Sequence, residues 1–132
     1  MYRTLALTIA LLAILQVLGC SAMNNSSTRV LQSVTVAPAT ADAKDFSNGQ
    51  VSFSATGNFS APPSPVTPLT VSGWTSSAPA IATVDFNSGM AQCVAGASGT
   101  VTIRASSPSG GPDMPMPGTA VLVSGTAQLS CP

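Results

Sequence analysis

The stretch WTSSAPAIATVDFNSGMAQCVAGASGTVTI, residues 74–103, contains three short apolar runs separated by turn residues. The first run ends at Phe86 and the second begins at Met90, with Asn-Ser-Gly between them. A hairpin turn needs positive φ at such positions, and Asn and Gly tolerate it. The third run alternates apolar and polar residues through Val101 and Ile103. This spacing is typical of consecutive antiparallel strands, and no helical periodicity is present.

The rest of the chain outward from this stretch shows the same alternation in short segments. Two stretches rich in proline and glycine, residues 57–68 and 107–118, are predicted to be loops, and residues 39–48 a polar link. Seven strands within about 100 residues are typical of a β-sandwich, so we expect an all-β fold. The predicted strands are residues 30–37, 49–56, 69–74, 81–86, 90–94, 101–103 and 119–129.

The composition excludes several classes of function. The 132 residues include 4 basic and 4 acidic side chains and no histidine, so the formal net charge is zero. A neutral chain offers no electrostatic footprint for nucleic acid. Without histidine, Ser-His and Cys-His catalysis are impossible within the chain. We therefore predict no enzyme, no nucleic acid partner and no cofactor.

No metal site is predicted either. The sequence has no zinc-ligand spacing and no calcium loop. Met114 and Met116 are two thioethers that could bind Cu(I), with Met90 as a third ligand. Two sulfur ligands are too few, so these methionines are better interpreted as ordinary loop residues.

The N-terminus has the features of an export signal. One basic residue, Arg3, precedes an almost wholly apolar run from Leu5 to Leu18. As a helix this run would be about 21 Å long, shorter than the ~30 Å hydrocarbon core of a bilayer. A short basic start followed by a short apolar run is typical of a secretory signal peptide.

The end of that run, Val17-Leu18-Gly19-Cys20, resembles the lipobox of bacterial lipoproteins. It departs from the usual pattern at Val17, where Leu is commonest, and at the bulky Leu18. The resemblance implies cleavage after residue 19, lipid attachment at Cys20 and a flexible tether over residues 20–29, before a domain over residues 30–132. The alternatives are an ordinary signal with an incidental cysteine, or an uncleaved anchor helix.

A second resemblance covers roughly residues 33–130. Trp74-x-Ser-Ser-x-Pro-x-Ile-Ala-Thr-Val-Asp85, then three glycines at 89, 96 and 99, then Val-Thr-Ile, is similar to the bacterial immunoglobulin-like domain of group 2. The earlier segments Val34-x-Val36-x-Pro38 and Gly49-Gln50-x-x-Phe53 match its first strands. The family implies a seven-stranded immunoglobulin-like β-sandwich that serves as a spacer or adhesive module on bacterial surface proteins. Such domains often occur in tandem, whereas this chain has one.

Four apolar residues are predicted to form the centre of the core. The chain has a single tryptophan, and a lone Trp at the end of an apolar strand is expected to fill a core. The single Tyr lies in the signal segment, so the domain has no tyrosine corner of the antibody type. The predicted core residues are Trp74, Val84, Val101 and Ile103.

If Cys20 carries lipid, Cys93 and Cys131 remain as an even pair in an oxidising compartment. They lie near the ends of the fifth and seventh predicted strands. Alternate strands of an antiparallel series run the same way, so both thiols are expected at one end of the sandwich. A disulfide closing this loop would stabilise the fold by roughly 3.5–4 kcal/mol. Two free thiols, or an intermolecular bond through Cys131, are the alternatives.

Together these features predict a non-catalytic module of the cell envelope with a structural or adhesive role. It would be exported and held by its N-terminal lipid in the outer membrane or at the cell surface, where an envelope protein or a surface polysaccharide could be its partner. The loops 57–68, 87–89 and 107–118 are expected at the end from which the tether leaves. The alternative function is a small-ligand or metal-binding lipoprotein that uses the loops 57–68 and 107–118.

Overall fold

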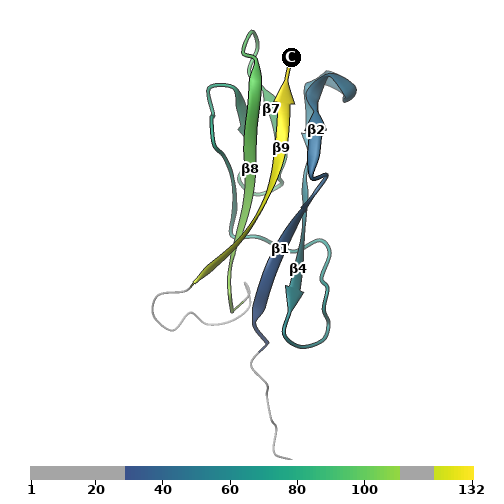
Figure 1. Cartoon of the computed structure of the whole chain (residues 1–132), viewed down its shortest axis with the longest axis vertical. Helices are drawn as coiled ribbons and strands as arrows, with labels where there is room; N and C mark the ends of the chain where they lie inside the picture. The colour runs from purple at the N-terminus through teal and green to yellow at the C-terminus, as the bar shows by residue number, and fades with distance from the viewer. Residues whose placement is uncertain (1–28, 111–120) are drawn as a thin grey trace, which may run out of the picture.

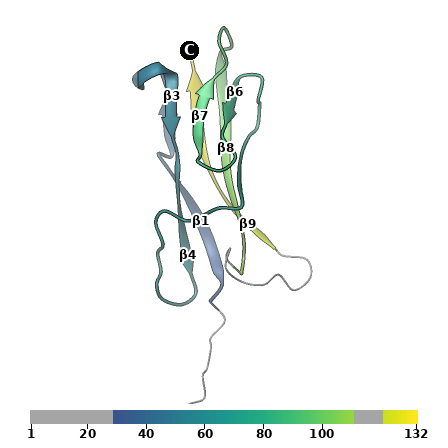
Figure 2. The same cartoon turned by 180° about the vertical axis from the view of Figure 1, so that it is seen from behind.

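The computed structural model describes residues 29–110 and 121–132. These residues form short and long β-strands and two single 3₁₀ turns, arranged as two facing layers in a sandwich-like fold (Figures 1 and 2). The expectation of an all-β fold is confirmed. The chain enters the first strand at one end of the elongated domain, and its C-terminus lies at the other end (Figure 1).

One layer is a four-stranded sheet. Its centre is a long hairpin of β8 (Gly99–Pro108) and β9 (Leu122–Cys131), paired over the full length of both strands. The strand β5 (Gly73–Ser76) pairs antiparallel with β8. On the other side β2 (Thr40–Asp42) pairs with β9 in the parallel direction. The resulting order is β2-β9-β8-β5.

The facing layer consists of two small sheets that share one continuous stretch of chain. In the first sheet β1 (Leu31–Ala37) pairs with β4 (Ser54–Phe59). The second has the order β3-β7-β6, and Figure 2 shows it beyond the end of the β1–β4 pair. Only residue 53 separates β3 from β4, so the two sheets are successive halves of one layer. The second sheet comprises β3 (Gln50–Ser52), β7 (Met90–Cys93) and β6 (Ala82–Val84).

The structure divides two predicted segments differently. The predicted strand 49–56 divides at Phe53, where the pairing partner changes from β7 and Gly89 on one side to β1 on the other. The predicted strand 69–74 becomes regular only at Gly73, because the Leu69 amide bonds to Ala55 at the edge of β4. With 49–56 divided in two and β2 as an additional strand, the described residues contain nine strands, where the sequence predicts seven.

The predicted polar link 39–48 also contains regular structure. It holds β2 and the 3₁₀ turns η1 (Ala43–Asp45) and η2 (Ser47–Gly49). The Asp42 carboxylate accepts a hydrogen bond of 3.2 Å from the amide of Lys44 and so caps η1. A strand of three residues has too few side chains to show an alternation of apolar and polar positions. The sequence of the link therefore gives no sign of β2.

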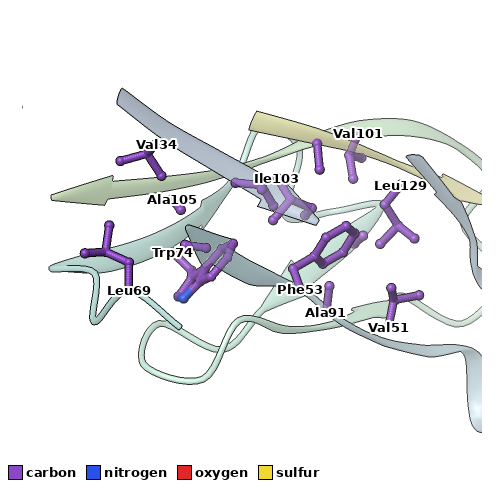
Figure 3. Close-up of a cluster of buried hydrophobic side chains, with 14 of the residues drawn as sticks. Val34, Val51, Phe53, Leu69, Trp74, Ala91, Val101, Ile103, Ala105 and Leu129 are labelled. Atoms are coloured by element: carbon purple, nitrogen blue, oxygen red, sulfur yellow. The ribbon is translucent and has the colours of Figure 1, made fainter. Parts of the chain in front are cut away.

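The core lies between the two layers (Figure 3). Inward residues alternate with outward ones on each long strand, as burial of one face requires. Trp74, Val101 and Ile103 are buried in this core. Val84 is only partly buried, because β6 is the edge strand of its sheet, so this predicted core residue packs at the rim. The remaining buried residues labelled in Figure 3 are Val34, Val51, Phe53, Leu69, Ala91, Ala105 and Leu129.

Candidate functional site

At the end of the domain where the chain enters β1, the side chain of Arg29 makes three contacts. The Arg29 guanidinium lies over the ring of Phe59, with 3.7 Å between its central carbon and the ring centroid. Its Nε donates to the carbonyl of Ala61 at 3.2 Å, and its Nη2 donates to the carbonyl of Pro63 at 2.5 Å. These three contacts fix the first described residue against the loop that follows β4.

Backbone hydrogen bonds join three segments at the same end. The amide of Ser60 donates to the Val30 carbonyl at 2.9 Å, and the Leu31 amide donates to Ser109 at 2.6 Å. The Ser109 amide in turn donates to the carbonyl of Val121 at 2.8 Å. We call this region the tether end, and it comprises Arg29, Val30, residues 60–65, Ser109, Val121 and Leu122.

The proline-rich loop folds back onto β4. Gly57 and Val66 exchange two backbone hydrogen bonds of 3.0 and 2.9 Å. The hydroxyls of Thr56 and Thr67 lie 2.6 Å apart, and the Ser64 hydroxyl accepts from the amide of Phe59. These hydrogen bonds stabilise the conformation of the loop.

The predicted gathering of loops at the tether end holds for two of the three segments. The loop after β4 and the described start of the loop 107–118 both lie there, as the bonds at Ser60 and Ser109 show. The prediction is wrong for residues 87–89, which stop midway along the domain at the β6–β7 turn (Figure 2). The reason is the shortness of β6 and β7, which leaves this turn against Phe53 and Trp74.

The opposite end holds the cysteine pair. Cys93 and Cys131 form a disulfide, as predicted, with 5.8 Å between their Cα atoms. Cys93 ends β7 and Cys131 ends β9, so the bond joins the two layers of the sandwich. The sulfur atoms therefore lock together two strands that share no backbone hydrogen bonds.

A groove of about 340 Å³ crosses the layer where its two small sheets meet. Trp74 borders it, yet only 4% of this residue is exposed, so the indole contributes to the wall and offers no open stacking face. The lining contains hydroxyl and amide groups and no charged side chain. It is formed by residues 52–55 and 68–71 with Trp74, Asn87 and Ser88.

The described carboxylates shape turns. Asp85 accepts hydrogen bonds from the hydroxyl and amide of Ser88, both at 2.7 Å, and from the amide of Asn87 at 3.2 Å. The Ser88 hydroxyl bond is the main cause that lowers the pKa of Asp85. Asp42 and Lys44 form an exposed ion pair of 2.8 Å, which lowers the pKa of Asp42 and raises that of Lys44.

Across residues 29–110 and 121–132, no cluster of three His, Cys, Asp or Glu side chains could hold a metal ion. No helix within these ranges is long and apolar enough to cross a membrane. Met114 and Met116 lie outside the described residues, and so does Cys20 with the predicted signal peptide and most of the tether. The interpretation of these methionines as ordinary loop residues and the prediction of lipid at Cys20 stay predictions.

Comparison with known proteins adds no relative. No protein-family model matches the chain, and none of the curated proteins searched matches it.

Sequence reasoning missed the contact between Arg29 and Phe59. The two residues are 30 positions apart in the sequence, and their meeting depends on the path of the loop after β4. The one local signal is a cation at the boundary between a polar segment and an alternating one, which does not by itself indicate an aromatic partner.

Proposed function

We propose that the chain is a non-catalytic, lipid-anchored module of the bacterial cell envelope. The motif Val17-Leu18-Gly19-Cys20 supports lipid attachment, and the path of the chain supports a module held from one end. The observation that carries the proposal is the path of the chain, which enters β1 at the end of the domain opposite its C-terminus (Figure 1). Arg29, the first described residue, follows Cys20 by nine positions. A domain so placed presents its disulfide end away from the anchor.

We also infer that the sandwich is of the immunoglobulin-like type. The segments β1 and β2 count as one strand that changes layer at Pro38, and β3 and β4 as one strand bent at Phe53. With these two unions the nine strands become the seven that the resemblance to the bacterial immunoglobulin-like domain implies. The strand order of the two layers is the support for this assignment.

The role we propose for the module is structural or adhesive. Its outer sheet face presents paired hydroxyl and amide side chains, such as Thr102 with Gln128 and Ser106 with Ser124. A surface of this kind suits neutral polar contacts with an envelope protein or a surface polysaccharide. The proposed location is the outer membrane or the cell surface.

The anchor is tested by metabolic labelling with palmitate and by partition into detergent. The wild-type chain is expected to carry label and to enter the detergent phase, and Cys20→Ala is expected to lose both properties. The matched control is the double variant Cys93→Ala/Cys131→Ala, which removes the other cysteines and should keep the label. Equal labelling of wild type and Cys20→Ala would remove the anchor from the proposal.

A second candidate function is the binding of a small neutral ligand in the groove beside Trp74. The observation in its favour is a groove of about 340 Å³ lined by hydroxyl and amide groups, into which the end of the proline-rich loop contributes Pro68. Titration with neutral oligosaccharides, followed by NMR shifts of Thr70 and Ser88, tests it. Saturable shifts confined to the lining would favour this function, and their absence would leave the structural role.

A further inference from the structure

Three apolar side chains are exposed at the tether end. Val121 is 69% exposed, Leu122 is 60% exposed and Val30 is 37% exposed. Neighbouring residues on an extended strand point to opposite faces, so a strand over a core normally buries one of each pair. Both Val121 and Leu122 are exposed, and β9 begins where the β8–β9 hairpin diverges from the β1–β4 pair (Figure 1).

The three residues belong to segments that backbone hydrogen bonds join at the tether end. Val30 bonds to Ser60, and Leu31 next to it bonds to Ser109, which bonds to Val121. Clustered exposed apolar residues on a small domain mark a contact surface more often than isolated ones do. The tether end is therefore a candidate contact surface, and its position in the chain indicates what it contacts.

The length of chain between Cys20 and the domain limits how far this end can lie from a bilayer. Arg29 is fixed by its contacts with Phe59, Ala61 and Pro63, so only the eight residues 21–28 of the predicted tether separate it from Cys20. Eight residues span at most about 29 Å when fully extended. A flexible polar chain of this length averages about 16 Å from end to end. A lipid on Cys20 consequently keeps the tether end within about 29 Å of the membrane surface.

The charges of the domain fit the same arrangement. Among the described residues, Arg29 is the one ionisable side chain at the tether end, and Asp42, Lys44 and Asp45 lie around η1 at the opposite end (Figure 1). Asp113 falls outside the described ranges. An apolar group beside a cation suits the interfacial region of a bilayer, where apolar side chains enter the acyl boundary and basic ones meet phosphates.

We propose that the tether end docks on the bilayer that holds Cys20. Val30, Val121 and Leu122 enter the interfacial region, and Arg29 faces the lipid phosphates. This inference rests on the proposed lipid anchor, and it adds a second, non-covalent contact that orients the domain. The long axis then stands away from the membrane, with the disulfide end outermost. The loop after β4 faces lipid and is not open to distant ligands.

The test uses the full-length lipidated protein in vesicles of phosphatidylethanolamine and phosphatidylglycerol. An environment-sensitive fluorophore is attached at Val121→Cys and, in a separate protein, at Val94→Cys. The pair is matched, because both substitutions replace an exposed valine and Val94 lies near the disulfide end. The introduced cysteine is the single reactive thiol when Cys20 is acylated and Cys93 is bonded to Cys131.

Nitroxide-labelled lipid should quench the fluorophore at position 121 at least about threefold more strongly than the one at position 94. Adding Leu122→Ser and Val30→Ser to the Val121→Cys protein should reduce that quenching while the protein remains on the vesicles. Both residues are exposed, so these changes leave the core intact.

Three outcomes would overturn the inference. Equal, weak quenching at both positions on vesicle-bound protein rejects docking but leaves the anchor in place. A spectral shift at position 121 that grows with protein density, without quenching by lipid, assigns the surface to a second copy of the chain. Failure of the wild-type protein to bind vesicles rejects the proposed anchor itself, and docking falls with it.

Discussion

Gly89 lies so close to Trp74 that a Cβ atom at position 89 would stand 2.7 Å from the indole atom Cε2. The same Cβ would stand 2.8 Å from the carbonyl oxygen of Phe53. The residue also has a φ of +72°, which side chains other than glycine adopt at a cost. The β6–β7 turn therefore closes over the tryptophan at a position that only glycine fits.

Gly89→Ala should destabilise the fold more than Gly96→Ala. Both residues have positive φ, but nothing lies within 4 Å of a Cβ at position 96. The backbone cost of about 1–2 kcal/mol applies to both variants, and the clash with Trp74 applies only to the first. Urea unfolding followed by Trp74 fluorescence measures the difference. Equal losses in the two variants would show that the turn moves freely away from the indole.

The Cys93–Cys131 disulfide should contribute about 4 kcal/mol to the free energy of unfolding, because it closes a loop with a sequence separation of 38. Reduction, or the double change Cys93→Ala/Cys131→Ala, should lower the urea midpoint accordingly. Each single variant should lose nearly as much, since either one breaks the bond. A midpoint that does not respond to a reductant in the wild type, under conditions where both thiols become alkylatable, contradicts this expectation.

Stability should fall with acid through Asp85. The hydrogen bonds from Ser88 lower the pKa of this carboxyl in the folded state below its ordinary value of 3.8. The contribution of the ionised Asp85 to the free energy of unfolding is therefore complete above pH 3.8, and it is lost as the pH falls through the folded-state pKa. Asp85→Asn should be less stable than wild type at pH 6 and should lose less stability between pH 4 and pH 2.

Thermal unfolding across this pH range measures the effect, and Ser88→Ala should reproduce part of it by removing the strongest hydrogen bond to the carboxylate. Asp42 contributes in the same direction through Lys44, so Asp42→Asn removes a second carboxyl that titrates in this range. Parallel curves for wild type and Asp85→Asn would exclude Asp85 from the acid response.

Arg29→Ala should free the entry segment from the loop after β4. The loss of the contact with Phe59 is expected to cost about 0.5–1 kcal/mol, as for other exposed cation–π pairs. Arg29→Lys keeps the charge but cannot donate from two fixed nitrogens to Ala61 and Pro63 at once. Amide exchange at Ser64 and Val66 should rise in both variants, and more in the alanine variant. Unchanged exchange would mean that the loop holds itself without Arg29.

The sequence revealed inward-facing positions better than strand limits. The alternation in the predicted strand 49–56 puts Val51, Phe53 and Ala55 on one face, and all three are buried. Burial of one face imposes a period of two residues, and this period is visible locally. The start of β5 and the separation of β3 from β4 depend on bonds to distant segments, such as that between Phe53 and Gly89, and these leave no trace in a local pattern.

The same distinction applies to the candidate site. The pairing of Cys93 with Cys131 followed from an even number of thiols and from strand direction, both of which the sequence contains. The turn at residues 87–89 lies midway along the domain because β6 and β7 are short. The alternation in the sequence predicts both strands to be longer than they are. The exposure of Val121 and Leu122 depends on where β9 diverges from the opposite layer, which no local pattern reports.

The parallel pairing of β2 with β9 determines how the domain responds to mechanical force. Arg29 and Cys131 lie at opposite ends, so tension between them pulls β2 and β9 in opposite directions along their length. Under this shear, the backbone bonds between the two strands must stretch together, whereas peeling would break them in succession. After these bonds break, the disulfide still joins Cys131 to Cys93, so the chain between the two cysteines cannot be extended by the force.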